Sequence, residues 1–349
     1  MSFTITVQPS GRSFVAEPGE SLLAASIRQN IGLPYSCKEG ACGACKCRKL
    51  AGEVTHGPYQ ERLLSAADVA AGFVLTCRAV AQSDVTLQAR QVTRQEAFAV
   101  KKMPARVVLL EKLSHDVMLL KLQLPANDLL QYHAGQYVEF VLRDGSRRCY
   151  SMASAPHTLT EGGAAAAPMV ELHIRHMPGG KFTDHVFGAM KEKDILRIEG
   201  PFGGFYLRED SQKPILLLAS GTGFAPAKAM LEHLQHTRST RAVALYWGAR
   251  RPQDLYLDAW VKAKQAEMPA TLRYVPVVSD ALPQDHWTGR TGFVHLAALQ
   301  DQPDLSGHEV YACGAPAMVQ AAQRDFVAQA ALPEDAFFAD AFTSAASGA

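Results

Sequence analysis

Three closely spaced cysteines constrain the fold of this chain more than any other feature of its sequence. Cys37, Cys42 and Cys45 have the spacing C-x4-C-x2-C, and Cys77 follows after thirty-one further residues. A tight loop can present three thiolates to one centre, and glycines at positions 40 and 43 let the backbone wrap closely around it. In a chain of 349 residues, this crowding indicates metal binding rather than a disulfide framework.

The spacing also indicates which metal centre to expect. A structural zinc site usually combines C-x2-C with a second close pair, whereas the fourth cysteine here stands alone. The pattern is that of plant-type [2Fe-2S] sites. We therefore predict four ligands, with a zinc site and free thiols as the alternatives: Cys37, Cys42, Cys45 and Cys77. Cys47 is a possible substitute ligand, but it is expected to start a strand as a bystander. Cys149 is expected to be a small buried hydrophobic residue.

Charge and hydropathy exclude several classes of function. Thirty-five basic residues face thirty-four acidic ones, for a net charge of +1, which argues against a general nucleic-acid binder. No polybasic membrane anchor is evident. No apolar run reaches the roughly 20 residues of a membrane span. The N-terminus lacks the charged start and apolar core of a signal peptide, so a cytoplasmic protein is expected.

Strand and helix patterns divide the chain into three parts. Residues 1–92 alternate as short strands around one main helix, which Ser21 can cap. Residues 93–103 are polar and are expected to form a linker. Residues 104–209 contain regular short strands, typical of an antiparallel barrel, with an exposed loop at 161–168. In residues 210–349, continuous apolar strands alternate with helices, which predicts a doubly wound parallel sheet.

The cysteine region resembles a known family. PYSCKEGACGACKCRKLAGEV and LTCRAV are similar to the cluster loop of plant-type ferredoxins, over about residues 1–90. The resemblance implies an α+β domain of the β-grasp type that carries a [2Fe-2S] cluster.

A second motif points to a flavin. Arg148-Cys149-Tyr150-Ser151 resembles the R-x-Y-S motif of the ferredoxin-NADP reductase superfamily. The resemblance implies that Arg148 contacts the flavin pyrophosphate, that Tyr150 packs against the isoalloxazine or ribityl chain, and that Ser151 lies near flavin N5. A guanidinium suits a diphosphate because its fork of donors can grip two oxygens. The alternative is a plain strand end.

Two neighbouring segments support the flavin hypothesis. The turn at 179–183, GGKFT, opens an expected helix, and amides at a helix N-terminus bind anions. We expect flavin phosphate contacts from Gly180, Lys181 and Thr183, although Lys181 alone would also suit a solvated charge. IEGPFGGFYL resembles the G-P-x-G-x-F element of the superfamily. FAD is expected rather than FMN, because an N-terminal ferredoxin resembles the FAD-containing oxygenase reductases.

A third motif points to a nicotinamide nucleotide. LLLASGTGFAPAKAML is a strand, a glycine turn and a helix, and it resembles the G-T-G-x-x-P turn of the same superfamily rather than G-x-G-x-x-G. The expected contacts come from Gly221, Thr222, Gly223 and Pro226. In YACGAPAMV, the resemblance puts Cys313 and Gly314 beside the nicotinamide ring; a buried core cysteine is the alternative.

Two further segments bear on the nucleotide. Arg250 and Arg251 would suit a 2′-phosphate, yet relatives with G-x-R at this point use NADH, so NADH is favoured over NADPH. FFADAF resembles the C-terminal segment that covers the flavin. Phe342 or Phe338 could shield the isoalloxazine ring there, and core packing is the alternative.

The resemblance covers about residues 2–342 and implies an oxidoreductase. NAD(P)H would reduce FAD, which would pass single electrons to the cluster and on to a protein acceptor such as an oxygenase. Ser151, Cys313 and Phe342 are the expected catalytic residues. GACGACK…GEVTHGPYQ resembles the reductases of CDP-6-deoxy-hexulose dehydrases in deoxysugar synthesis, while phenol and benzoate oxygenase reductases are also similar. One alternative is a redox sensor with vestigial cofactor sites, which would predict damage to Arg148, Ser151 or the 221–226 turn, and none of these is damaged. A diaphorase or oxidase without a protein partner is another.

Overall fold

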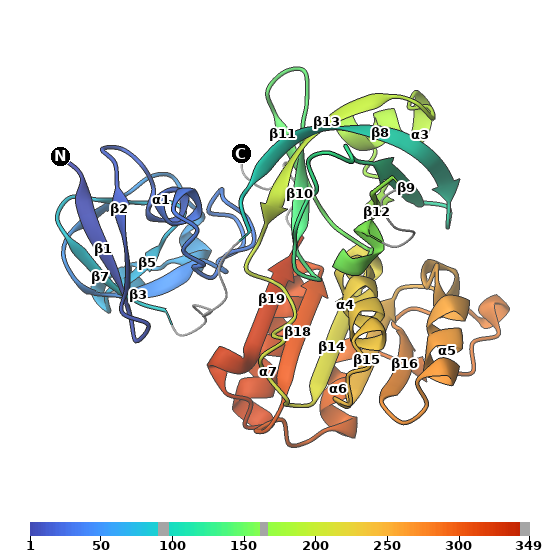
Figure 1. The fold of residues 1–349 in the computed structure, drawn as a ribbon. Coiled ribbons are helices and arrows are strands. Elements are labelled where there is room, and N and C mark those ends of the chain that lie inside the picture. Colours follow the sequence, from blue (N-terminus) through green and yellow to red (C-terminus); the bar gives the residue numbers. More distant parts are fainter. Residues whose placement is uncertain (90–97, 161–166, 343–349) are drawn as a thin grey trace. The chain divides into compact units, whose positions relative to one another are not determined.

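The computed structural model describes residues 1–89, 98–160 and 167–342, and they form two compact units. The first comprises residues 1–99 with Gly203–Phe205 and the segment from Ala341 onward; the second comprises Val100–Phe202 and Tyr206–Asp340 (Figure 1). Within the described residues, no helix combines the length and the apolar character needed to cross a membrane.

The first unit is built on a five-stranded sheet in the order β2-β1-β7-β3-β5. Its strands are β1 (Phe3–Gln8), β2 (Arg12–Ala16), β3 (Lys46–Ala51), β5 (Phe73–Leu75) and β7 (Val85–Gln88). β1 runs parallel to β7, and the other pairs are antiparallel. Helix α1 (Leu22–Arg28) begins where the Ser21 hydroxyl accepts a hydrogen bond from the Ala24 amide at 3.2 Å, as the sequence predicted.

Several smaller elements of this unit were not expected. Strands β4 (Val54–His56) and β6 (Ala79–Ala81) form a separate antiparallel pair. The 3₁₀ turn η1 (Glu61–Leu63) precedes a short helix, α2 (Ala66–Ala70), which starts with a capping box between Ser65 and Asp68. Apolar residues of the main sheet and α1 pack together into one continuous core next to the cysteine loop.

The second unit contains an antiparallel sheet in the order β11-β10-β13-β8-β9-β12. Its strands are β8 (Lys101–Lys112), β9 (Val117–Gln123), β10 (Tyr137–Val141), β11 (Arg147–Ser151), β12 (Met169–Arg175) and β13 (Ile195–Phe202). An isolated bridge between Met152 and Leu172 joins the two ends of the sheet, so it closes as a barrel. The turn η2 (Pro156–Leu159) and helix α3 (Lys181–Gly188) complete it.

The expected linker at 93–103 overlaps the first barrel strand. Lys101, Lys102 and Met103 already pair with β13, and the Met103 side chain is buried. Residues 93–97 of that linker, and 161–166 of the loop expected at 161–168, lie outside the described residues. The proposed domain boundaries therefore stay predictions.

The rest of the second unit is a six-stranded sheet in the order β17-β16-β15-β14-β18-β19. The strands are β14 (Ile215–Ser220), β15 (Val243–Ala249), β16 (Leu272–Val278), β17 (Arg290–Thr291), β18 (Glu309–Gly314) and β19 (Phe337–Ala341). Each pair of neighbouring strands from β17 across to β18 is parallel. Strand order reverses at β14, and open sheets of this kind bind ligands at the carboxyl ends of strands beside such a reversal.

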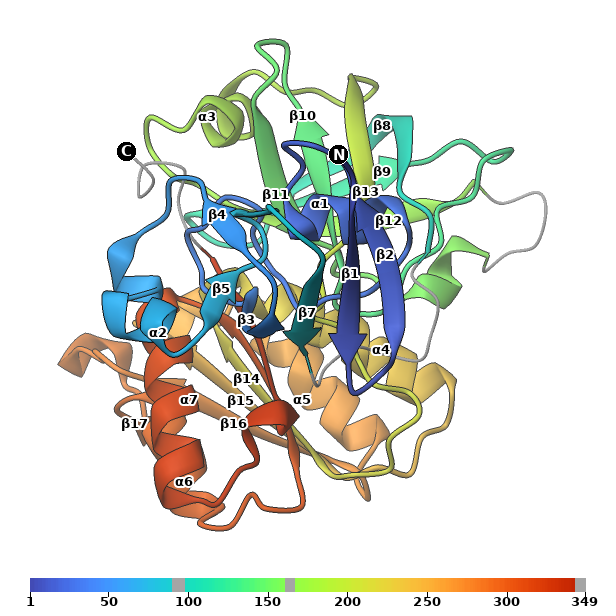
Figure 2. The same cartoon turned by 90° about the vertical axis from the view of Figure 1, so that its left-hand side faces the viewer.

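Helices cover both faces of this sheet. Figure 2 shows α4 (Phe224–His236) and α5 (Asp258–Glu267) on one side, with α6 (Val294–Asp301) and α7 (Pro316–Gln329) on the other. Short 3₁₀ turns connect them: η4 (Gly221–Gly223), η5 (Pro252–Asp254), η6 (Pro283–Asp285) and η7 (Glu334–Ala336). The residues of β14 are buried on both faces, as the apolar run predicted.

A buried polar network joins the barrel to the parallel sheet. The Lys228 ammonium on α4 lies 3.2 Å from the Glu171 carboxylate on β12 and 2.6 Å from Glu232. His173 bonds Glu171 through Nε2 and the Tyr256 hydroxyl through Nδ1, each at 3.0 Å. The Lys228 side chain is only 7% exposed, so its charge depends on these carboxylates for compensation.

Candidate functional site

The four predicted ligand cysteines come together as two pairs. The Sγ atoms of Cys45 and Cys77 lie 3.2 Å apart, and Cys37 and Cys42 hydrogen-bond to each other. Throughout the described ranges, no group of three or more His, Cys, Asp or Glu side chains could hold a single metal ion. Two thiolate pairs fit a two-iron centre, in which each iron needs two protein sulfurs, better than one tetrahedral zinc.

Backbone amides of the cysteine loop donate hydrogen bonds to two of the four sulfurs. The backbone amides of Cys37 and Ala41 donate to the sulfurs of Cys42 and Cys37, respectively, each at 3.4 Å. Hydrogen bonds from Cys42 and from nearby amides lower the pKa of the Cys37 thiol to about 6. Gly40 and Gly43 have φ values of +72° and +81°, which only glycine adopts without strain.

Cys47 and Cys149, which are not predicted ligands, differ from each other in burial. Cys47 pairs with Val74 within β3 and is 3% exposed, and burial raises the pKa of its thiol to about 12. It therefore lies in the core, and its role as a bystander to the cluster stays a prediction. The expectation that Cys149 is buried is wrong. It is exposed, because β11 is an end strand of the barrel sheet and Cys149 shares a face with exposed Arg147.

The flavin motif presents one uncompensated arginine. Arg147 donates to the carboxylates of Glu139 and Glu199, each at 2.7 Å, and so has a structural role. Among the described residues, the neighbouring Arg148 donates only to the Arg147 carbonyl, at 2.7 Å. Its guanidinium keeps most of its donors available for an anion.

The aromatic ring of the motif faces the barrel interior. Tyr150 packs against Phe140 and Phe182, with centroid distances of 5.8 and 5.4 Å. Burial raises the pKa of its hydroxyl, so the ring stays neutral. Tyr150 is thus a rigid aromatic surface at the end of β11, as a ring-stacking residue requires.

The glycine turn before α3 is tightly built. A Cβ on Gly180 would lie 2.6 Å from Thr183 Oγ1 and 2.8 Å from the Met177 carbonyl. The Thr183 hydroxyl is buried and donates to the Met177 carbonyl at 2.9 Å, so it closes this turn. Lys181 is exposed and pairs with Asp144 at 2.6 Å. A flavin phosphate contact from these three residues stays a prediction.

The predicted nicotinamide turn lies where the strand order reverses. A Cβ on Gly223 would lie 2.2 Å from the Cys313 carbonyl oxygen, and one on Gly314 would lie 2.3 Å from Ser220 Oγ. The Ser220 hydroxyl also accepts from the Ala315 amide at 2.9 Å. The ends of β14 and β18 therefore interlock through two glycines. Thr222 and Pro226 are buried beside them, at the start of α4.

A guanidinium that sequence reasoning missed stands beside this turn. Arg175 ends β12, and its Nη1 lies 3.0 Å from the position that a Cβ on Gly221 would occupy. Asp116 accepts from Arg175 Nε at 2.8 Å and fixes the side chain. A cation at a glycine turn favours phosphate binding, but nothing in the local sequence around Arg175 indicated this contact.

Two expected catalytic residues converge on one carboxylate. Ser151 Oγ donates to Asp340 Oδ2 at 3.4 Å, and the Cys313 thiol lies 3.9 Å from the same oxygen. All three side chains are buried. Burial and the neighbouring carboxylate raise the pKa of the Cys313 thiol well above its ordinary range, so it stays protonated. The barrel, the parallel sheet and the C-terminal strand thus each contribute one polar group to the same point.

The C-terminal aromatic residues have separate environments. Phe338 is buried, stacks on Tyr311 at 4.8 Å and lies under the Arg208 guanidinium at 4.6 Å, as in the core-packing alternative. Phe342 is 37% exposed and ends the last described segment. It belongs to the first unit, so its role in shielding a flavin stays a prediction.

Carboxylates accompany the two arginines that follow β15. Asp280 lies 3.9 Å from Arg250 and 3.8 Å from Arg251, and Asp285 lies 3.5 Å from Arg251. The positive charge expected there is therefore partly neutralised, although Arg250 is largely exposed.

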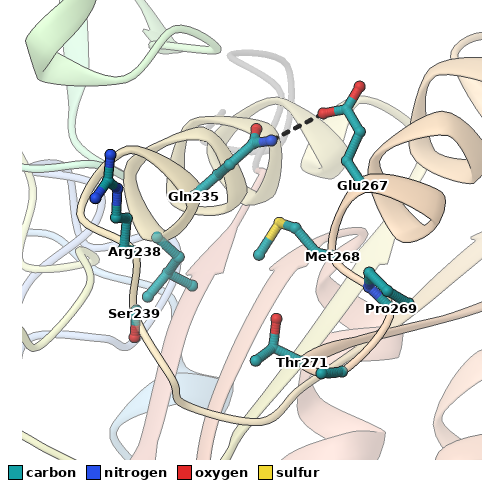
Figure 3. Close-up of a pocket in the computed structure, with 9 residues that line it drawn as sticks. Gln235, Arg238, Ser239, Glu267, Met268, Pro269 and Thr271 are labelled. Carbon is teal, nitrogen blue, oxygen red and sulfur yellow. Dashed lines mark hydrogen bonds between the residues drawn. The ribbon is translucent and has the colours of Figure 1, made fainter.

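A hollow of about 280 Å³ lies apart from these groups (Figure 3). The residues that line it belong to the ends of α4 and α5 and the segment before β16, at the opposite edge of the sheet from the carboxyl ends of the strands. It contains none of the predicted site residues.

Comparison with known families assigns all three parts of the chain. A 2Fe-2S iron-sulfur cluster binding domain matches residues 5–82, an oxidoreductase FAD-binding domain matches 104–206, and an oxidoreductase NAD-binding domain matches 217–324.

Full-length relatives and solved structures agree with this assignment. CDP-6-deoxy-L-threo-D-glycero-4-hexulose-3-dehydrase reductase of Yersinia pestis is 40% identical over 98% of this chain and 99% of its own. Terephthalate 1,2-dioxygenase reductase component 1 of a Comamonas species is 34% identical over 100% of this chain and 99% of its own. The crystal structure of an Amycolatopsis cytochrome P450 reductase covers 98% of this chain and 99% of its own, at 33% identity and a TM-score of 0.77.

Proposed function

We propose, from the premise that this chain belongs to the NAD(P)H-dependent flavin iron-sulfur reductases, that it oxidises NADH and delivers single electrons to a separate protein. The observation that carries the proposal is the convergence of Ser151 and Cys313 on Asp340, because it joins the barrel to the carboxyl ends of the parallel strands. That junction is where a flavin held by the barrel and a nicotinamide held by the sheet can meet.

The chain's residues bind and orient the cofactors. FAD bound to these residues would supply hydride acceptance and the release of single electrons to a one-electron cluster. Among the described residues, Arg148 donates only to the Arg147 carbonyl, which supports its assignment to the flavin diphosphate. The close approach of Gly223 to Cys313, and of Gly314 to Ser220, holds the ends of β14 and β18 together where we propose that the nicotinamide binds. Asp340 accepts from the Ser151 hydroxyl and so restricts its orientation, and contact with the reacting edge of the flavin is the proposed role of this hydroxyl.

The cysteine pairs support the ligand assignment. In our proposal Cys37 and Cys42 hold one iron, and Cys45 and Cys77 hold the other. The paired arrangement and the amide hydrogen bonds to sulfur favour this assignment over the zinc alternative.

NADH is the proposed donor. An acidic group at the end of the second nucleotide strand would hold a ribose hydroxyl, whereas arginine there suits a 2′-phosphate. Asp280, which follows β16, lies 3.9 Å from Arg250 and 3.8 Å from Arg251 and partly neutralises these two arginines. This arrangement supports NADH over NADPH.

The proposed acceptor is a dehydrase or an oxygenase component. Identity is higher to the dehydrase reductase, at 40%, than to the terephthalate dioxygenase reductase, at 34%, so a dehydrase of deoxysugar synthesis is the first acceptor to test. An oxygenase component is the second. Reduction of each purified acceptor by NADH through this chain would separate the two.

Anaerobic stopped-flow absorbance tests the function. On mixing with NADH, the flavin band should bleach first, and the cluster should then be reduced; a redox sensor would show neither change. Cys42→Ser should abolish cytochrome c reduction and leave ferricyanide reduction, because only the latter can proceed from the flavin. Cys47→Ser, the buried non-ligand control, should retain both. Equal loss of both activities in Cys42→Ser would contradict the proposed electron path.

A further inference from the structure

Arg78 directly follows the last predicted ligand and is fixed by the backbone. Its amide donates to the Leu75 carbonyl at 2.9 Å, and its carbonyl accepts from the Gly57 amide at 2.8 Å. These two bonds hold Arg78 between the end of the main sheet and the β4–β6 pair. The start of its side chain is therefore set by the same turn that presents the Cys77 sulfur.

The Arg78 side chain runs along the loop that carries the other cysteines. A Cβ on Gly40 would lie 3.0 Å from Arg78 Cγ and 3.2 Å from Arg78 Nε, with Tyr59 Cβ also at 3.2 Å. Gly40 lies between Cys37 and Cys42. The missing side chain of Gly40 thus makes room for the arginine stem, in addition to allowing the turn of the loop.

The Arg78 Nε–H is a buried donor that has no acceptor among the described residues. Leaving such a donor without an acceptor costs free energy, and the cost is larger for a charged group. Other arginines of this chain, such as Arg28 with Glu20 at 2.7 Å, have carboxylate partners. The loop beside this donor also carries Cys37 and Cys42, whose sulfurs would be anionic as cluster ligands.

We propose that Arg78 donates to the iron-sulfur cluster and raises its reduction potential, which favours electron transfer from the flavin. The proposal rests on the proposed ligand assignment. Reduction adds one electron, supplied by NADH through FAD, and no bond or proton is transferred at the cluster. The reduced centre carries one more negative charge than the oxidised centre. A fixed cation nearby therefore stabilises the reduced form more.

A redox titration of the full chain, followed by EPR of the reduced cluster, tests the proposal. Arg78→Gln should reduce the equilibrium constant for cluster reduction about tenfold, which is about 59 mV for a one-electron couple. Arg78→Lys keeps the charge but not the planar donor, and should shift the potential less. Arg48→Gln, an exposed arginine on β3, should leave it unchanged. An unchanged potential in Arg78→Gln at full iron content would overturn the proposal.

A second measurement uses the wild-type protein and so does not depend on a variant that assembles a cluster. Arginine labelled with ¹⁵N in the guanidinium should give a hyperfine coupling in pulsed EPR of the reduced protein, because Arg78 Nε contacts the cluster. Absence of this coupling, with the cluster signal present, would also overturn the role of Arg78. Absence of iron and of any cluster signal in the wild type would instead refute the proposed function.

Discussion

Replacing Gly223 with alanine should separate the two strands that interlock at the nucleotide end of the sheet. A Cβ there would lie 2.2 Å from the Cys313 carbonyl oxygen and 2.8 Å from Gly314 Cα, and both are backbone atoms that cannot rotate away. Relief requires a shift of about 1 Å between the turn and β18. Overpacking of this kind costs about 1–3 kcal/mol. Because Gly223 has an ordinary helical φ of −59°, the substitution adds no backbone strain.

The effect should appear in both stability and rate. A loss of about 2 kcal/mol lowers the melting temperature of a unit of this size by about 4–8 °C. A displacement of about 1 Å at the nicotinamide site should slow flavin reduction by NADH about 100-fold. Stopped-flow bleaching of the flavin band and differential scanning calorimetry measure the two effects.

Gly188→Ala provides the matched control. It is also a helical glycine, but its added Cβ meets nothing within 4 Å, so stability should stay the same or rise by about 0.5–1 kcal/mol. Wild-type melting and wild-type flavin reduction in Gly223→Ala would refute the view that this close approach positions the nicotinamide.

Three further substitutions test single assignments. Arg148→Ala should weaken FAD binding about tenfold or more and release flavin during gel filtration, whereas exposed Arg143→Ala should retain it; full occupancy in Arg148→Ala would exclude the diphosphate contact. Asp340→Asn should slow flavin reduction by NADH about tenfold, since it weakens a hydrogen bond to a charged acceptor, and an unchanged rate would remove Asp340 from the site. Asp280→Ala should raise kcat/KM for NADPH about tenfold by removing a charge that repels the 2′-phosphate. Steady-state kinetics with both nucleotides measure this effect, and an unchanged ratio of kcat/KM for NADPH to kcat/KM for NADH would contradict it.

The sequence predicted the elements whose signals are local. The Ser21 cap, the apolar strand at 215–220 and the cysteine spacing each lie within a few residues, and the structure has the corresponding helix start, buried strand and thiolate pairs. The β4–β6 pair was missed because each strand has only three residues, too few to show a period. The start of β8 was missed because Lys101 and Lys102 look like linker residues, although they pair with β13.

The parts of the site that depend on tertiary contacts could not be predicted in the same way. Asp340 is 189 positions from Ser151, and its carboxylate becomes informative only when β19 brings it beside β11 and β18. No local pattern distinguishes Arg175, because its neighbour Gly221 belongs to another part of the chain. The motif singled out Arg148, but the structural role of Arg147 became visible only from the carboxylates of Glu139 and Glu199 opposite it.

The network around Lys228 limits how this reductase can be recombined with its relatives. A chimera that took its barrel from one protein and its parallel sheet from another would have to preserve Lys228, Glu171 and Tyr256 together, because they come from both sides of the junction. Removing one partner of a buried ion pair costs about 3–5 kcal/mol. We therefore expect the barrel and the parallel sheet to be inherited together as one unit among these reductases.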